Sequence, residues 1–179
     1  MLKILLVIAN QGYQPIEYEI PKKLMAQAGI KVITASNQAG IATASDGSQT
    51  NVDITLDQVN TNDYGGIFFI GGPGAITDLD NEASYKIIQE IAKLGKPFGA
   101  ICISPRILAK AGVLKNKKAT GWESKDNPVA PVFKKYGVIY EKKGVVIDGN
   151  IVTATCPANA AEFGNAIIKL LKKENKETI

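Results

Sequence analysis

The sequence GAICISP at residues 99–105 places a thiol, Cys102, between an apolar run and the expected start of a helix. A nucleophile that ends a buried strand and precedes a helix has the layout of a nucleophile elbow. Because the amide groups of a helix N-terminus favour negative charge, this position predicts a lowered thiol pKa and a reactive thiolate. The alternative is that Cys102 is only a small buried apolar side chain.

Two other features offer groups that act on a ligand. The sequence GGPG at residues 71–74 follows an apolar run, and glycines there let backbone amides approach a ligand closely. It lacks the spacing of the phosphate-binding glycine motifs, so a tight turn is the alternative.

Glu17 lies just inside the first expected helix, where a carboxyl group is either functional or a solvated partner of the helix dipole. Glu19 is nearby and is a second candidate for that surface role.

The composition restricts the chemistry further. The chain has 179 residues, 2 Cys and 0 His, which excludes histidine metal ligands, a Cys-rich zinc site and Ser-His or Cys-His catalysis. The net charge is only +4, and Arg106 is the sole arginine among 21 basic residues. A single guanidinium offers little bidentate recognition of phosphates or base edges, so we expect no nucleic-acid partner.

Apolar runs and helical periodicity predict the elements that position these groups. Strands are expected at 2–9, 31–35, 66–70, 97–101, 118–122, 138–140, 145–147 and 151–154, with a hairpin over 40–56 around Asp46-Gly47. Helices are expected from Pro15 to Gly29, after Gly74 with Ile87, Ile88, Ile91 and Leu94 inward, over 104–111, from Asp126 to Tyr136, and through 163–171.

Strands that are continuously apolar and alternate with helices predict an α/β fold, a parallel sheet with helices on both faces. No linker or repeat interrupts the pattern, so we expect one domain over residues 1–179. In such sheets the site lies at the carboxyl ends of the strands, here residues 10–17, 71–75, 101–104 and 154–157. The absence of a long apolar run predicts no membrane span, and the few cysteines favour the cytoplasm.

Taken together, these segments resemble the ThiJ/PfpI superfamily, whose flavodoxin-like fold is similar to class I glutamine amidotransferases. The resemblance covers nearly the whole chain and depends on five motifs in order. They are IEYEIP at 16–21, GGPGA at 71–75, AICISP at 100–105, AGVL at 111–114, and TATCP at 153–157 followed by EF at 162–163.

The resemblance implies a role for individual residues. Cys102 matches the family nucleophile, and Glu17 matches the carboxyl group that hydrogen-bonds the thiol. The backbone amides of Gly72 and Ile103 match the oxyanion hole. An acid that keeps its proton beside a thiolate donates to the sulfur, so the pair shares one proton. The family is usually dimeric, so a homodimer is expected by resemblance.

The departures from the family pattern bear on function. Peptidase-like members carry His directly after the cysteine, where this chain has Ile103. The parkinsonism-associated deglycase branch often has His where Trp122 falls, and the late motif replaces an Arg-Gly pair by Thr155 and Cys156. The peptidase interpretation therefore lacks a general base. The anion-binding pocket of the deglycase branch would have fewer basic residues in this chain.

Several nearby residues have two interpretations. Cys156 either resolves an oxidised Cys102 into a disulfide or simply fills a glycine position. Arg106 either adds positive potential near the thiol or points to solvent or a partner subunit. Tyr13 and Trp122 either line the pocket or serve packing or dimer contacts, and Thr155 and Arg106 are further possible pocket-lining residues.

Three functions follow from this pattern. The first is a cysteine-dependent enzyme of glyoxalase or deglycase type, acting on small carbonyl compounds without a cofactor or metal. The second is a non-catalytic redox sensor or stress protein, in which an oxidant converts Cys102 to a sulfinate. The third is an intracellular cysteine peptidase or amidase, which the absence of His disfavours in one subunit and across a homodimer alike.

Overall fold

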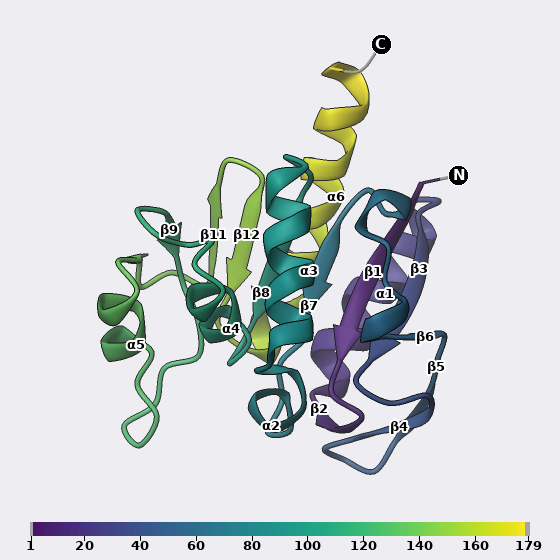
Figure 1. The fold of residues 1–179 in the computed structure, drawn as a ribbon, viewed down its shortest axis with the longest axis horizontal. Helices are drawn as coiled ribbons and strands as arrows, with labels where there is room; N and C mark the ends of the chain where they lie inside the picture. Colours follow the sequence, from purple (N-terminus) through teal and green to yellow (C-terminus); the bar gives the residue numbers. More distant parts are fainter. Residues whose placement is uncertain (1, 178–179) are drawn as a thin grey trace.

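A seven-stranded sheet forms the centre of the computed structural model, which describes residues 2–177 (Figure 1). Its order is β11 (Val145–Asp148), β12 (Ile151–Ala154), β8 (Phe98–Ile101), β7 (Ile67–Phe69), β1 (Lys3–Ile8), β3 (Lys31–Ser36) and β6 (Ile54–Thr55). All neighbouring pairs are parallel except β11 and β12, which form an antiparallel edge. The predicted α/β class with a mostly parallel sheet is confirmed.

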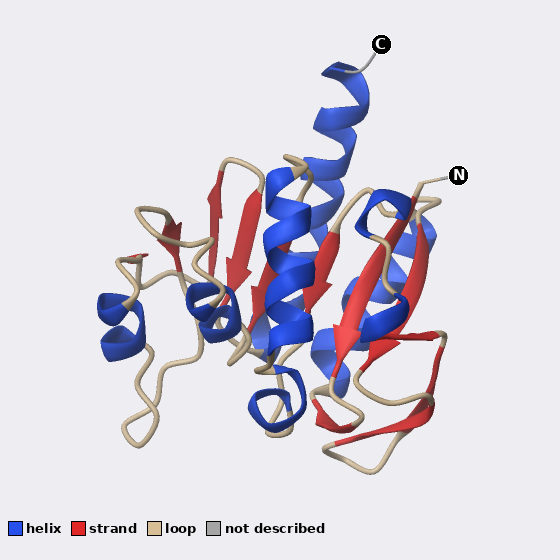
Figure 2. Cartoon of the chain, in the orientation of Figure 1, coloured by secondary structure: helices blue, strands red, loops and turns tan. Residues whose placement is uncertain are grey.

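Helices cover both faces of this sheet (Figure 2). α1 (Pro15–Gln27) and α6 (Ala160–Glu177) pack together on one face, and α3 (Glu82–Lys93) and α4 (Pro105–Lys110) pack on the other. The short helices are α2 (Ala75–Leu79) and α5 (Ala130–Lys135). Strands such as β1 are therefore buried on both sides, which explains their continuous apolar sequences.

Smaller elements flank the central sheet. The predicted hairpin is present as β4 (Gly40–Ala44) and β5 (Gln49–Val52), and it joins β2 (Gln11–Tyr13) in a second sheet. β9 (Lys118–Ala119) pairs with β10 (Ile139–Tyr140). Three 3₁₀ turns lie at η1 (Leu56–Gln58), η2 (Thr61–Asp63) and η3 (Pro157–Asn159).

The segment between Gly74 and Leu94 differs from the prediction of one helix. It divides into α2 and α3, because Asn81 adopts an extended conformation and its side chain accepts the amide of Ser84 as an N-cap. Leu94 is exposed instead of facing inward, since it lies at the C-cap after the last helical turn.

The segment from residue 118 to 136 also differs. The strand expected to reach Trp122 ends at Ala119, and the helix expected from Asp126 begins at Ala130. The carboxylate of Glu123 accepts the amide of Val129 at 2.7 Å and so holds the intervening loop in place.

Within residues 2–177, no helix has the length and apolar character that crossing a membrane requires.

Candidate active site

Cys102 occupies a strained position at the carboxyl end of β8. Its φ is +63°, a left-handed conformation that residues other than glycine seldom adopt. Its amide donates to the carbonyl of Ala154 at 2.9 Å, which ties the turn to β12. The buried hydroxyl of Ser104 donates to the carbonyl of Ile70 at 2.7 Å and ties the start of α4 to β7. The strain and these two anchors give Cys102 the geometry of a nucleophile elbow.

Two glycines bring the neighbouring segments against Cys102. A Cβ atom on Gly71 would lie 2.5 Å from the Cβ of Cys102 and 2.7 Å from a carboxyl oxygen of Glu17. Gly72 has a φ of +115°, and a Cβ there would lie 2.5 Å from the backbone nitrogen of Gln14. Any side chain at either position would push these segments apart, so glycine permits the close approach.

Glu17 reaches the site from the first turn of α1, and its side chain is fully buried. Its Oε2 accepts the amide of Gly71 at 3.0 Å, while no nitrogen or oxygen donor among the described residues reaches Oε1. Burial raises the pKa of Glu17 from its ordinary 4.5 to about 7, against the opposing hydrogen bonds from Cys102 and Gly71. Glu17 is thus poised to exchange a proton near neutral pH.

The pKa of the Cys102 thiol moves opposite to the sequence-based expectation. Burial raises this pKa, and so do the charge of Glu17 and the hydrogen bond to it, whereas the amides of Gly72 and Ile103 lower it. The helix field therefore does not dominate. The two groups share one proton. Above pH 7 that proton is on the Cys102 sulfur, and Glu17 is an ionised carboxylate beside a neutral thiol.

Cys102 opens into a cavity of about 290 Å³ between the strand ends and the loop after β9. Its lining residues are Gln14, Gly72, Pro73, Cys102, Ile103, Trp122 and Pro157. The amide of Trp122 donates to the carbonyl of Cys102 at 2.7 Å, which fixes the indole-bearing segment beside the thiol. The amides of Gly72 and Ile103 act on the sulfur itself, as expected for donors that stabilise charge at this point.

The structure places two other candidate residues away from the cavity wall. Arg106 points neither to solvent nor to a partner, because it is buried and its Nη2 donates to the carbonyls of Trp122 at 3.3 Å and Asn127 at 2.8 Å. Tyr13 is buried against Tyr18 in an edge-to-face contact at 5.5 Å between ring centroids, so it serves packing.

Thr155 and Cys156 lie in the half-buried segment after β12. Thr155 and the Cys156 thiol both hydrogen-bond Oδ1 of Asn159, at 2.6 Å and 3.3 Å. Because β12 pairs with β8, Cys156 follows the strand end adjacent to the one that carries Cys102. Both cysteines are free thiols, so the resolving role of Cys156 stays a prediction.

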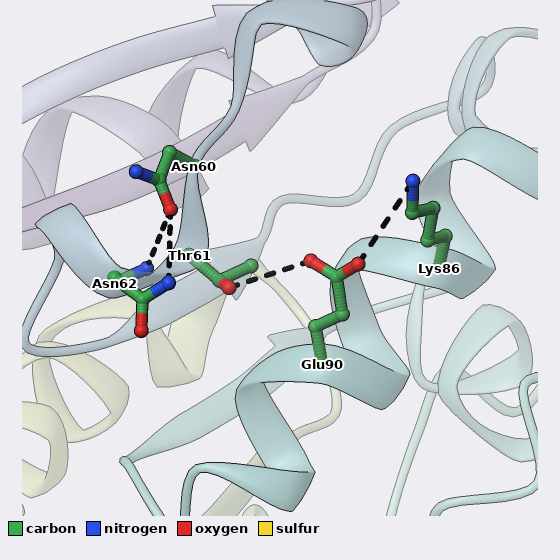
Figure 3. Close-up of polar contacts among 5 residues, drawn as sticks. All are labelled: Asn60, Thr61, Asn62, Lys86 and Glu90. Carbon is green, nitrogen blue, oxygen red and sulfur yellow. Dashed lines mark hydrogen bonds and ion pairs between the residues drawn. The ribbon is translucent and has the colours of Figure 1, made fainter.

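A second hollow, of about 530 Å³, lies between η2 and α3. Figure 3 shows Glu90 there between Thr61 and Lys86, with contacts of 3.4 Å and 4.0 Å. Its carboxylate is thus already partnered, and no cysteine or serine lies among the lining residues that the structure describes. No group of three or more potential metal ligands gathers anywhere within residues 2–177. The cavity at Cys102 is therefore the better candidate.

Sequence reasoning missed parts of the cavity. Gln14 lies in the expected segment 10–17 but has no assigned role there; its side chain accepts the amide of Ile16, caps α1, and lines the cavity that Cys102 also lines. Pro73 and Pro157 stand inside the quoted motifs but were given no role. Both lie within the strand-end segments 71–75 and 154–157 where the site was expected, so the signal located the segments but did not single out these side chains.

Comparison with known proteins gives a consistent result. The model of the DJ-1/PfpI family matches residues 2–170. The protein MJ0967 of Methanocaldococcus jannaschii is 36% identical over 97% of this chain and 84% of its own length. Deglycase PH1704 of Pyrococcus horikoshii is 31% identical over 96% of this chain and 100% of its own. The crystal structure of a ThiJ/PfpI domain protein from Brachyspira murdochii superposes with a TM-score of 0.90 at 27% identity, covering 96% of each chain. This chain belongs to the DJ-1/PfpI family.

Proposed function

We propose that the protein is a cysteine-dependent enzyme of glyoxalase or deglycase type that acts on small reactive carbonyl compounds. The observation that carries this proposal is the Glu17–Cys102 pair, in which a buried carboxyl group with a pKa of about 7 stands beside a thiol that opens into a cavity. The relative from Pyrococcus horikoshii is named a deglycase, which supports the same activity here.

The proposed reaction begins with addition of the thiol to an aldehyde. The Cys102 sulfur bonds to the aldehyde carbon, Glu17 carboxylate takes the thiol proton, and the former carbonyl oxygen receives a proton to give a hemithioacetal. During attack the amides of Gly72 and Ile103 stabilise the developing oxyanion. The chain has 0 His, so Glu17 carries out the acid–base steps that imidazole performs in many thiol enzymes.

For methylglyoxal, an internal rearrangement completes the reaction without an external oxidant. Glu17 removes the proton from the hemithioacetal carbon and returns it to the adjacent carbonyl carbon, while the hydroxyl proton of the first carbon moves to the oxygen of the second. The first carbon is thereby oxidised and the second reduced, which leaves a thioester of lactate on Cys102. Water hydrolyses that thioester, releases lactate and restores the thiol.

The test is lactate production from methylglyoxal by the purified protein. We expect Cys102→Ser to abolish it and Glu17→Gln to reduce it by at least about a hundredfold, the scale of a lost general base. Cys156→Ser is the matched control and should retain activity. Lactate formation that persists in Cys102→Ser, or none in the wild-type protein, would contradict the proposal.

A redox-sensing role is the second candidate, and the same carboxyl group favours it. A Glu17 that retains its proton to about pH 7 donates a hydrogen bond to an oxidised sulfur. Two molecules of peroxide would convert the Cys102 thiolate to a sulfinate and release two molecules of water. Intact mass after limited peroxide tests this role. Failure to gain two oxygens, or an equal gain in Cys102→Ser, counts against it.

We also propose that the protein is a homodimer, on family resemblance alone. Light scattering of the purified chain measures its mass in solution, and a mass near that of a single 19.1 kDa chain would reject the dimer.

A further inference from the structure

The walls of the cavity at Cys102 carry no fixed charge. Of the seven lining residues described, only Cys102 is ionisable, and the other polar groups on side chains are the amide of Gln14 and the indole N–H of Trp122. No lysine or arginine lines it, although the chain holds 21 such residues. The ligand that enters therefore meets mainly hydrocarbon and backbone.

From these walls we propose that the site selects uncharged aldehydes with an apolar, flat substituent and discriminates against anionic ones. This inference rests on the proposed function and names its substrate class. An anion would leave water without gaining a cationic partner, and ionised Glu17 beside the thiol would repel it further.

Arg106 is the only guanidinium that stands near the thiol, and the loop after β9 occupies it. Its Nη2 donates to two carbonyl oxygens of that loop, and the residue is only 7% exposed. These bonds hold the guanidinium against the loop, although its charge still acts on Cys102. The positive charge of Arg106 stabilises the loop that carries Trp122, and Arg106 is not among the residues that line the cavity.

The apolar walls suit a flat substituent. Trp122, 37% exposed, supplies an aromatic face, and Ile103 and Pro157 supply aliphatic surface on the same cavity. A volume of about 290 Å³ is at the lower end of the range for small-molecule sites, enough for a single ring with an aldehyde arm. Offset or edge-on contact between a ligand ring and an indole is favourable beyond the area that it buries.

Protection of Cys102 from iodoacetamide measures this preference without requiring turnover. The probes are phenylacetaldehyde, propanal and glyoxylate, each normalised to its protection of N-acetylcysteine so that hydration and intrinsic electrophilicity cancel. We expect phenylacetaldehyde to protect at a concentration at least about tenfold lower than propanal, and glyoxylate to need one at least tenfold higher. Equal normalised protection by phenylacetaldehyde and glyoxylate would overturn the inference.

Variants of Trp122 test whether the wall sets the order. Trp122→Lys should improve normalised protection by glyoxylate at least tenfold and remove the advantage of phenylacetaldehyde, while Trp122→Phe should keep the wild-type order. Ile139→Lys adds the same charge on the 50% exposed Ile139 of β10, outside the cavity lining, and should change nothing. An unchanged order in Trp122→Lys would also overturn the inference.

Turnover separates this inference from the proposed function. Comparison of methylglyoxal with phenylglyoxal should show a higher kcat/KM for phenylglyoxal. If neither compound is turned over but the protection order holds, the proposed function fails and the selectivity stands. If both are turned over and methylglyoxal is preferred, the selectivity fails and the proposed function stands.

Discussion

Replacing Glu17 by Gln should make the protein more stable at alkaline pH. Burial raises the pKa of Glu17 from 4.5 to about 7, so between these values the folded protein keeps a proton that the unfolded chain releases. The free energy of unfolding therefore falls as the pH rises through this window. At about 1.4 kcal/mol per pKa unit, the fall amounts to about 3 kcal/mol.

The assay is urea unfolding of the wild-type protein and of Glu17→Gln at intervals from pH 4 to pH 9. The chain has 0 His, so no imidazole titrates between pH 5 and pH 8, and the slope there reports few other groups. The constant cost of the substitution cancels when each variant is compared with itself across pH. We expect the stability of Glu17→Gln relative to wild type to increase by about 3 kcal/mol from pH 4 to pH 8.5.

Glu19→Gln is the matched control, because Glu19 is an exposed carboxylate of the same helix. Its difference from wild type should stay constant within about 0.5 kcal/mol over the same range. Parallel curves for wild type and Glu17→Gln would refute the reasoning. They would mean that Glu17 keeps an ordinary pKa and that burial does not hold its proton.

Three other substitutions test the site. Gly71→Ala should separate Glu17 from Cys102, because its Cβ would lie within 2.7 Å of both side chains, so activity should fall at least about tenfold while circular dichroism still shows a folded chain. Arg106→Met should lower the free energy of unfolding by about 2 kcal/mol in urea titrations, because two part-buried carbonyls of the loop lose a charged donor. If Cys156 resolves an oxidised Cys102, intact mass after mild peroxide should show the loss of two hydrogens in the wild-type chain in place of the gain of two oxygens, and Cys156→Ser should show only that gain.

The fold was predictable because its signals are local. The inner strands β1, β7 and β8 are continuous apolar runs, and β1 is buried on both faces as its sequence indicates. The edge strand β6 is only Ile54–Thr55 and was expected inside the hairpin over 40–56. The boundaries that failed depend on contacts between distant segments. The strand through Trp122 ends early because Arg106 and Glu123 hold the following loop by hydrogen bonds, and no spacing rule shows those partners.

The candidate site was predictable in its residues but not in its electrostatics. Cys102 and Glu17 follow from motif positions at the strand ends, whereas the pKa of the thiol depends on a balance between opposing influences. Burial and a carboxylate raise that pKa, and two amides lower it. A sequence reveals the helix that follows Cys102, but it does not reveal how completely the other side of the sulfur is desolvated.

The missing histidine gives this balance its functional meaning. In the proposed reaction, a thiol whose pKa is raised needs a base at the moment of attack, and Glu17, which hydrogen-bonds the thiol, is the group that would act as that base. That base works only while it is buried, because exposure to water would return its pKa to 4.5 and leave it too weak to take the proton. The cost in stability above pH 7 and the capacity for proton transfer therefore have one physical origin, the desolvation of Glu17.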